Sequence, residues 1–310
     1  MRILFMGTPD FAVPCLEAMV NHGYEVVSVI TQPDRPKGRG KKVLPSPVKA
    51  KAMEFGIDVL QPKKIKEKEF IQAIKSIEID CIVVVAYGQI LPKGILQLPE
   101  KGCINVHASL LPRFRGAAPI HWSIINGEEK TGITTMYMDE GLDTGDMILK
   151  EEVSIGKEMT TGELHDILSN LGAKVLIETL KLIESSKAPR MSQDDSKSSY
   201  APMLDRELGL IDWQNNSQDI YNLVRGLNPW PVAYTMYKGT KMKIWKCTIT
   251  HEDTNGEPGQ ITKVNKEGIH VITGKGSIVI EEIQFPNSRK MRVDEYIRGN
   301  TIEDSILLGE

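Results

Sequence analysis

One apolar segment constrains the fold of this chain more than any other part of the sequence. Residues Asp80–Ala86 have the sequence DCIVVVA, in which polar and apolar side chains do not alternate. A strand of this composition is expected to be covered on both faces, as the strands of parallel sheets are. It is far shorter than the roughly 18 apolar residues that a membrane-spanning helix requires. We therefore expect a buried strand inside an α/β domain.

Strands and helices alternate in the first half of the chain. Arg2–Met6 and Tyr24–Ile30 have the apolar composition of buried strands, and Thr8-Pro9-Asp10 between them is typical of a helix start. Two further helices are expected, one beginning at Ser46 and one over Lys66–Ser76. This alternation predicts an α/β fold with a doubly wound, mostly parallel sheet of Rossmann-like type. Ligands of such sheets bind beyond the carboxyl ends of the strands.

The second half of the chain has a different pattern. A long helix over about Thr161–Glu184 is followed by a stretch rich in Ser, Lys and Pro that has no periodicity. Five short, often β-branched segments then follow between Val232 and Ile283, each bounded by Gly or Asn, which is typical of a small OB-like β-barrel. We expect a Rossmann-like domain over 1–186, a linker over 187–204 and an OB-like barrel over 205–310.

Composition and charge exclude several classes of protein. The formal net charge of -3 gives no global attraction to nucleic acid, so any basic surface must be local. The N-terminus begins directly with an apolar run and lacks the parts of a signal peptide. The four cysteines show no CxxC spacing and the six histidines show no ligand pattern, which favours buried free thiols and no metal site. We expect a cytoplasmic protein that uses neither a membrane nor a metal.

Asn105 and His107 are the first candidates for chemistry. They lie two residues apart at the end of an expected strand over Cys103–Val106, and side chains with this spacing share one face of a strand. An amide beside an imidazole can polarise a carbonyl and transfer a proton, which acyl transfer requires. On its own, the tripeptide is more often a polar strand end whose histidine bonds to the backbone.

Three neighbouring segments add to this pair. Ser109–Gly116 is a loop whose proline and glycine define its backbone, and Ala86–Pro92 leaves the most buried strand and would border the same crevice. Asp139–Asp146 is a tight acidic turn, from which a carboxylate could lie against His107 and hold its tautomer. Each segment also has an ordinary interpretation, as a connecting loop or a solvated turn. The acidic turn does not have the spacing of an EF-hand calcium loop.

These motifs together resemble the folate-dependent formyltransferases. The run NVHASLLPRFRG, which begins at Asn105, matches the signature of that family, and GLDTGD follows at the family's spacing. The resemblance covers almost the whole chain. Segments similar to the family members that formylate a tRNA-bound amino acid are GTPDFA at 7–12, TQPDRPKGRGKK at 31–42, VAYGQILP at 85–92 and NPWP at 228–231.

The resemblance implies a reaction and the residues that carry it. The formyl donor would be 10-formyltetrahydrofolate, and the acceptor would be the α-amino group of initiator methionyl-tRNA. Catalysis would belong to Asn105, His107 and Asp143, without a metal. The residues implied in folate binding are Ser109, Leu110, Leu111, Pro112, Ile90, Leu91, Pro92 and Asp139.

A basic loop is the expected site of tRNA contact. Residues 35–51 carry seven basic side chains and no acid. Such a run is usually a solvated surface, but Arg and Lys contacts to phosphates also dominate nucleic-acid affinity. The resemblance implies that the loop enters the acceptor arm. In the expected barrel, Lys241 and Lys243 alternate along a strand and would share one face, which makes a small stripe for phosphates, with a solvated strand as an equal alternative. The expected tRNA-binding residues are Arg35, Lys37, Arg39, Lys41, Lys42, Lys241 and Lys243.

Two other functions remain open from the sequence. One is a related formyltransferase whose acceptor is a small amine, such as a purine precursor or a nucleotide sugar. The other is an RNA-binding module with an inactive site. The basic loop and the barrel disfavour the small-amine acceptor, and we expect the protein to act as a monomer.

Overall fold

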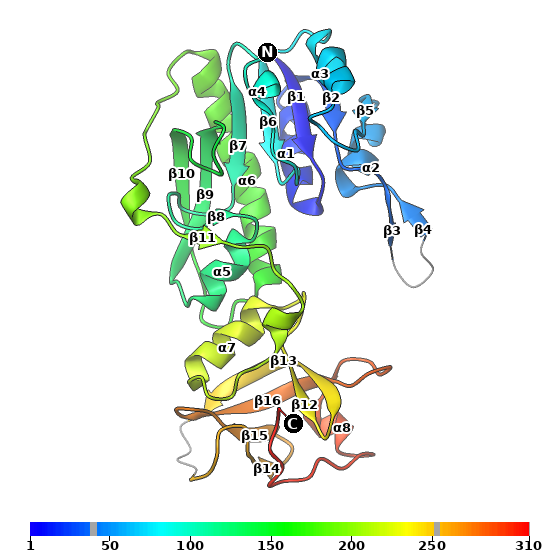
Figure 1. The fold of residues 1–310 in the computed structure, drawn as a ribbon, viewed down its shortest axis with the longest axis vertical. Coiled ribbons are helices and arrows are strands. Elements are labelled where there is room, and N and C mark those ends of the chain that lie inside the picture. Colours follow the sequence, from blue (N-terminus) through cyan, green and yellow to red (C-terminus); the bar gives the residue numbers. More distant parts are fainter. Residues whose placement is uncertain (38–41, 251–254, 310) are drawn as a thin grey trace. The chain divides into compact units, whose positions relative to one another are not determined.

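A seven-stranded sheet carries the segments that the sequence marks for chemistry (Figure 1). The structure is a computed structural model that describes residues 1–37, 42–250 and 255–309, and of Lys37 and Lys42 it describes the backbone alone. The sheet order is β10 (Met147–Ser154), β9 (Lys130–Tyr137), β7 (Cys103–His107), β6 (Cys81–Val85), β1 (Arg2–Gly7), β2 (Glu25–Ile30) and β5 (Val59–Leu60). The strands from β7 to β5 are parallel, and β9 is antiparallel to β7. The predicted mostly parallel, Rossmann-like sheet is therefore confirmed.

The order of the strands reverses at β1, which pairs with β2 on one side and with β6 on the other. In doubly wound sheets this reversal marks the place where ligands bind, beyond the carboxyl ends of the strands. Two loops meet there, because Thr8 Oγ1 donates a 3.1 Å hydrogen bond to the carbonyl oxygen of Tyr87. The loop after β6 thus begins beside the loop after β1.

The expected helix start at Ser46 is confirmed, whereas the segment after Thr8-Pro9 begins as a 3-10 turn without a side-chain cap, and the α-helix that follows starts at Val13. The Oγ of Ser46 caps the helix that starts at Pro47 by accepting a hydrogen bond from the Lys49 N–H at 3.1 Å. Gly172 lets the longest helix approach β7, since a Cβ at that position would lie 3.2 Å from Val106 Cγ1. The elements are η1 (Asp10–Ala12), α1 (Val13–Asn21), α2 (Pro47–Glu54), α3 (Lys68–Lys75), α4 (Lys93–Leu96) and α6 (Thr161–Glu184).

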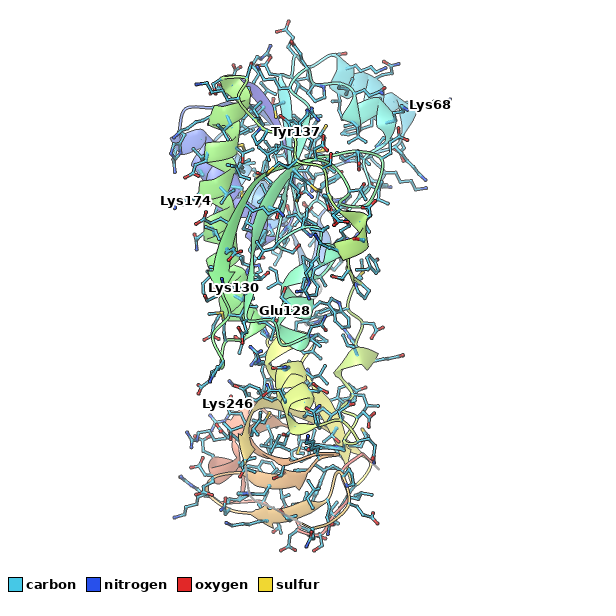
Figure 2. All side chains as sticks on the ribbon, turned by 90° about the vertical axis from the view of Figure 1, so that its left-hand side faces the viewer. Lys68, Glu128, Lys130, Tyr137, Lys174 and Lys246 are labelled. Carbon is cyan, nitrogen blue, oxygen red and sulfur yellow. The ribbon has the colours of Figure 1, made fainter. Side chains whose placement is uncertain are left out.

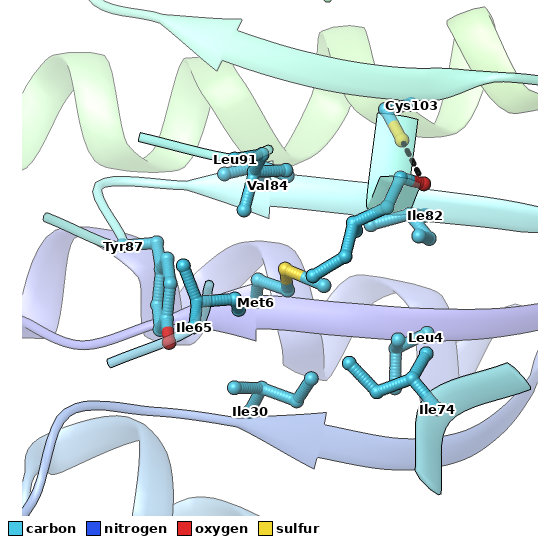
Figure 3. Close-up of a cluster of buried hydrophobic side chains, with 11 residues drawn as sticks. Leu4, Met6, Ile30, Ile65, Ile74, Ile82, Val84, Tyr87, Leu91 and Cys103 are labelled. Atoms are coloured by element: carbon cyan, nitrogen blue, oxygen red, sulfur yellow. Dashed lines mark hydrogen bonds between the residues drawn. The ribbon is translucent and has the colours of Figure 1, made fainter. Parts of the chain in front are cut away.

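Apolar side chains from the central strands form the main core (Figure 3). Leu4 and Met6 of β1 lie beside Ile82 and Val84 of β6, and each is at most 5% exposed. Burial of one such side chain contributes about 1.5–3 kcal/mol. All five residues of β6 are buried, as the sequence predicts for a strand covered on both faces.

The remaining strands form an antiparallel sheet in a second unit of the chain. This unit comprises residues 120–130, 154–164 and 202–310, and the first unit comprises the rest. The sheet curls as a half-barrel does, which confirms the predicted OB-like architecture (Figure 1). Its order is β12 (Tyr234–Tyr237), β13 (Thr240–Thr250), β16 (Ser277–Gln284), β15 (Ile269–Ile272) and β14 (Ile261–Val264), with β17 (Met291–Arg292) on β16. The helical elements are α5 (Pro119–Ile125), η3 (Glu207–Gly209), α7 (Ser217–Gly226) and α8 (Val293–Tyr296).

Most of the polar stretch after α6 packs on the first unit. We call residues 190–201 the strap. Met191 forms an antiparallel bridge with Met147, the 3-10 turn η2 (Asp195–Lys197) follows, and β11 (Tyr200–Ala201) pairs in parallel with β8 (Arg115–Gly116). Hydrogen bonds of the backbone therefore order this segment although its sequence has no periodicity.

Three further observations concern membrane spans, metal-binding groups and cysteines. No described helix is long and apolar enough to cross a membrane. Within residues 1–37, 42–250 and 255–309 there is no group of three or more His, Cys, Asp or Glu side chains that could hold a metal ion. All four cysteines are free and buried, as predicted, and burial raises the pKa of Cys15 to about 12.

Candidate active site

Asn105 and His107 lie at the carboxyl end of β7 and share a face of the sheet, as their spacing requires. Asn105 Nδ2 donates a hydrogen bond of 3.3 Å to Oδ1 of Asp143. His107 Nδ1 lies 3.7 Å from the other carboxylate oxygen of Asp143, Oδ2. The side chain of His107 is 6% exposed and that of Asp143 is 12% exposed, so the three groups meet in surroundings largely shielded from water.

The second ring nitrogen of His107 fixes the tautomer of the neutral ring. Nε2 lies 2.9 Å from the carbonyl oxygen of Phe114. Because a carbonyl oxygen only accepts hydrogen bonds, Nε2 carries the hydrogen. Nδ1 is then the nitrogen with the free lone pair in the neutral ring, and the carboxylate of Asp143 faces it.

Asp143 is held by both its neighbours and its own backbone conformation. Its φ angle of 54° lies in the left-handed region, which aspartate adopts more readily than most side chains. Its Oδ2 accepts a 2.8 Å hydrogen bond from the backbone N–H of Gly116, in addition to the bond that Oδ1 accepts from Asn105. The carboxylate is therefore fixed between β7 and the segment that follows it.

The acidic turn between β9 and β10 is closed by its own side chains. Asp139 Oδ1 accepts hydrogen bonds from the Gly141 N–H at 3.0 Å and from Thr144 Oγ1 at 2.7 Å. Gly145 packs against Tyr137, a residue labelled in Figure 2, so closely that a Cβ atom would overlap its carbonyl oxygen. The turn thus needs a glycine at this position for reasons of space.

We expect Gly145→Ala to lower the midpoint of thermal unfolding by about 2–8 °C, because overpacking of this kind costs about 1–3 kcal/mol. The overlap with the Tyr137 carbonyl can be relieved only by movement of the backbone. The matched control is Gly94→Ala in α4, where a Cβ would meet Ile71 at an ordinary 3.7 Å. Thermal unfolding followed by circular dichroism measures both, and an unchanged midpoint for Gly145→Ala would contradict the packing argument.

The residues expected to contact folate divide into buried and exposed groups. Leu111 is 1% exposed and packs with Met136 and Met147, whereas Leu91 is 4% exposed and belongs to the main core. Ile90 is 81% exposed. The two leucines therefore support the site by packing, and Ile90 presents its side chain to the surface. Of the other expected residues, Ser109 is buried, Leu110, Pro112 and Pro92 are partly buried, and Asp139 is exposed.

Neighbouring strands hold the segment around Ser109. Thr134 Oγ1 of β9 donates a 2.7 Å hydrogen bond to the carbonyl oxygen of Ser109 and accepts one of 3.2 Å from the Leu111 N–H. Lys150 Nζ of β10 donates to the carbonyl oxygen of Leu111 at 2.5 Å. The path of this segment beside His107 is thus determined by the sheet itself.

The predicted basic loop contains a hairpin, in which β3 (Arg35–Lys37) pairs antiparallel with β4 (Lys42–Leu44). Figure 1 shows these two strands projecting beyond α2. At the base of the hairpin the carboxylate of Asp34 contacts Lys49 Nζ at 2.6 Å and Gln61 Nε2 at 2.7 Å. The hydrogen bond from Lys49, and then that from Gln61, holds the pKa of Asp34 below its usual range. The charge of Lys49 is therefore already paired.

The hairpin contains the residues expected to meet tRNA, and the structure describes only some of them. The side chain of Arg35 is exposed. Lys37 and Lys42 have a described backbone in β3 and β4. Arg39 and Lys41 lie outside the described residues.

Lys241 and Lys243 lie on β13 with the spacing that places side chains on one face. Lys241 is exposed, and its Nζ lies 3.4 Å from the centroid of the Tyr234 ring, a cation–π contact. Lys243 is partly buried and pairs with Tyr234 in the strand ladder. The two lysines and the ring form one basic and aromatic surface on the second unit.

Two residues beside the site were not predicted from the sequence: Gln193, which contacts the acidic turn, and Arg115, which contacts Gln193. The amide nitrogen of Gln193 donates hydrogen bonds to the carbonyl oxygens of Asp143 and Gly145, both at 2.8 Å. Its Oε1 accepts from Arg115 Nε at 3.1 Å and from Arg115 Nη2 at 2.8 Å. No local pattern marks Gln193, because the strap has the composition of a linker.

Two family models match most of the chain. Residues 1–180 match the family described as Formyl transferase, and residues 203–301 match Formyl transferase, C-terminal domain. The methionyl-tRNA formyltransferase of Clostridioides difficile is 58% identical, with 100% of this chain and 100% of that protein covered. That of Acetivibrio thermocellus is 55% identical with the same coverage.

Solved structures share the fold at low identity. HypX from Aquifex aeolicus in complex with tetrahydrofolic acid has a TM-score of 0.65 and 16% identity, over 96% of this chain and 47% of that one. An N-formyltransferase from Helicobacter canadensis in complex with folinic acid and dTDP-3-aminofucose has a TM-score of 0.67 and 20% identity, over 90% of this chain and 98% of that one. At these identities the likeness shows the fold alone.

Proposed function

The chain belongs to the family of methionyl-tRNA formyltransferases, and we propose that Asn105, His107 and Asp143 carry out its reaction. That reaction transfers the formyl group of 10-formyltetrahydrofolate to the α-amino group of initiator methionyl-tRNA and gives N-formylmethionyl-tRNA for translation initiation. The observation that supports the assignment is the meeting of the three side chains, with 3.3 Å from Asn105 to Asp143 and 3.7 Å from His107 to Asp143.

Asn105 and His107 stabilise the oxygen of the formyl group during the reaction. When the amine attacks the formyl carbon, a C–N bond forms and the carbonyl oxygen becomes an oxyanion. The Asn105 amide has two N–H bonds, and the one that does not face Asp143 donates to this oxygen. Once Nδ1 of His107 has taken the proton that the attacking amine loses, its N–H makes a second donor to the oxyanion. Loss of one such donor typically costs about 3–4 kcal/mol of transition-state stabilisation.

His107 and Asp143 account for the protons. The attacking amine must lose a proton, and the folate nitrogen must gain one when its bond to the formyl carbon breaks. Nδ1 of His107 transfers this proton, because Nε2 is occupied by the Phe114 carbonyl. Asp143 then faces the positively charged ring and stabilises it. The proton that the amine loses is the one that the folate nitrogen gains, so no further proton donor or acceptor is needed.

The donor occupies the region bordered by Ile90–Pro92, Ser109–Pro112 and Asp139. Ile90 offers apolar surface, since its side chain is 81% exposed. The buried Leu91 and Leu111 fix the backbone on either side. Contacts to the pterin therefore come mainly from main-chain groups, with Ile90 packing against its ring.

The hairpin and the lysines of the barrel bind the tRNA. We expect Arg39→Ala to reduce kcat/KM for methionyl-tRNA. In a plot of log(kcat/KM) against log salt concentration, the slope should become shallower by about one, the value for one phosphate contact. The KM for 10-formyltetrahydrofolate should not change. Initial rates at several potassium chloride concentrations measure both quantities.

Lys51→Ala is the matched control for Arg39. Lys51 lies on α2, just after the hairpin, and its Nζ is already paired with Glu17 at 3.0 Å and Glu54 at 2.6 Å. Removal of this charge should leave the salt dependence unchanged. If Arg39→Ala reduced folate affinity as much as tRNA use, the loop would belong to the folate site instead.

The acceptor assay tests the function as a whole. The protein is incubated with 10-formyltetrahydrofolate and either charged initiator tRNA or a small amine such as an amino sugar nucleotide. We expect formylation of the tRNA alone. Formylation of the small amine alone would make the protein a relative with another acceptor, and tRNA binding without turnover would make it an inactive RNA-binding module.

We also propose which parts of the chain carry out catalysis and which assist tRNA binding. Residues 1–186 carry the three catalytic side chains, 187–204 connect them to the barrel and include the strap that packs on the first unit, and 205–310 form the barrel that assists tRNA binding. The separate family matches over 1–180 and 203–301 support this division. A role in translation initiation supports a cytoplasmic location, and we propose that the protein acts as a monomer.

A further inference from the structure

The side-chain amide of Gln193, in the strap, contacts the backbone of the turn that carries Asp143 at two points. Gln193 Nε2 donates to the carbonyl oxygens of Asp143 and Gly145, both at 2.8 Å, and these carbonyls lie on either side of Thr144. The strap is itself anchored beside the site. The N–H of Phe114 donates to Ser199 Oγ at 2.9 Å, in addition to the pairing of β11 with β8.

The Gln193 amide fits this place in one orientation only. Its nitrogen faces two carbonyl oxygens, which only accept hydrogen bonds, and its oxygen faces Arg115 Nε and Nη2, which only donate. Rotation of the amide by half a turn would set donors against donors and acceptors against acceptors. A glutamate would keep the contact with Arg115 but place an oxygen against both carbonyls. The four contacts therefore specify a glutamine.

Asp143 is the residue that this arrangement fixes. Its φ of 54° is a sparsely populated backbone conformation, which persists where surrounding contacts determine it. Gln193 holds its carbonyl oxygen, while Gly116 and Asn105 hold its carboxylate. Without the hydrogen bond from Gln193 to its carbonyl oxygen, the backbone of Asp143 can rotate and move the carboxylate away from Nδ1 of His107.

We propose that Gln193 is a positioning residue, which acts on catalysis by fixing the backbone of Asp143 through its amide nitrogen. The inference rests on the proposed role of Asp143. Because Gln193 acts only through the position of Asp143, its loss should lower kcat. The KM of both substrates should stay nearly unchanged. Displacement of a reacting group by about 1 Å can reduce a rate by about 10²-fold.

Two variants and one control test the proposal in the full-length protein. Gln193→Leu removes all four polar contacts at similar size, and Gln193→Glu removes only the two donated bonds. We expect both to lower kcat by about 10-fold to 100-fold, with each KM within about threefold of wild type. Lys197→Ala changes an exposed strap residue that pairs with Asp194 and should keep wild-type kcat. Thermal unfolding shows whether each variant is folded.

A double-mutant cycle separates positioning from a general structural role. With Asp143→Ala there is no carboxylate left to position, so adding Gln193→Leu should reduce kcat by less than about twofold. An equal additional loss in that background, or a Gln193→Glu variant with wild-type kcat, would overturn the proposal. The rates are measured with whichever acceptor the wild-type protein formylates. Wild-type turnover of methionyl-tRNA decides the proposed function separately.

Discussion

Replacement of His107 by alanine should lower kcat for the formylation of methionyl-tRNA by about 10²–10⁴-fold, the usual contribution of a positioned acid–base group. The variant loses the nitrogen that moves the proton and one donor to the oxyanion. It also leaves Asp143, 12% exposed, without the ring that faces it. Single-turnover measurements with both substrates bound isolate this effect from binding.

Two controls separate the chemistry of His107 from its structural role. His107→Gln can place an amide N–H near the Phe114 carbonyl, where Nε2 donates in the wild type at 2.9 Å, but it has no nitrogen that titrates. Its activity should therefore be as low as that of His107→Ala. Affinity for tRNA should stay unchanged in both, since the side chain of His107 is only 6% exposed. Near-normal turnover in either variant would refute the assigned role.

Asp143→Asn should reduce kcat on the order of 10⁴-fold, as loss of the carboxylate does in other histidine–carboxylate pairs. Both oxygens of Asp143 accept hydrogen bonds, one from Asn105 and one from the Gly116 N–H. An asparagine has a single side-chain acceptor, so its NH₂ group must face a donor. The substitution also removes the negative charge beside His107 Nδ1.

Asp146→Asn is the matched control for Asp143→Asn. Asp146 ends the same turn, and its carboxylate contacts Ser192 at 3.3 Å and Arg190 at 3.5 Å. Both variants remove one negative charge from the turn, and only Asp143 faces the imidazole. We expect Asp146→Asn to retain wild-type kcat in the single-turnover assay. If the two variants lost activity equally, the effect of Asp143→Asn would reflect the net charge of the turn.

The positions of Asn105 and His107 could be predicted from the sequence because a strand has a strict period of two. The apolar run of β6 predicted the centre of the sheet for a similar reason, since burial on both faces leaves a composition without alternation. The contact of Asp143 with His107 depends on residues far apart in the chain. The acidic turn predicted a carboxylate beside His107, but only the family signature indicated that this carboxylate belongs to Asp143.

The strap, β10 and the hairpin were not predicted, and each lacks a local signal. Gln193 and its neighbours are ordered by backbone pairing and by contacts to distant carbonyls, which no periodicity reveals. The strand Met147–Ser154 is half polar and lies at the edge of the sheet. Lysine and glycine, which dominate the hairpin sequence, are depleted in strands. Tertiary context therefore determined the strap and β10, and the local pairing of β3 with β4 forms the hairpin.

The strap has a consequence for any attempt to divide this enzyme. A fragment that stops at the end of α6, Glu184, contains Asn105, His107 and Asp143 and would look complete by its signature motifs. It would lack Gln193 and Ser199, and with them the bonds to the Asp143 carbonyl and the Phe114 N–H. The smallest piece that keeps the site intact therefore runs through Ala201, so that recombination or fusion should join chains after this residue and not before it.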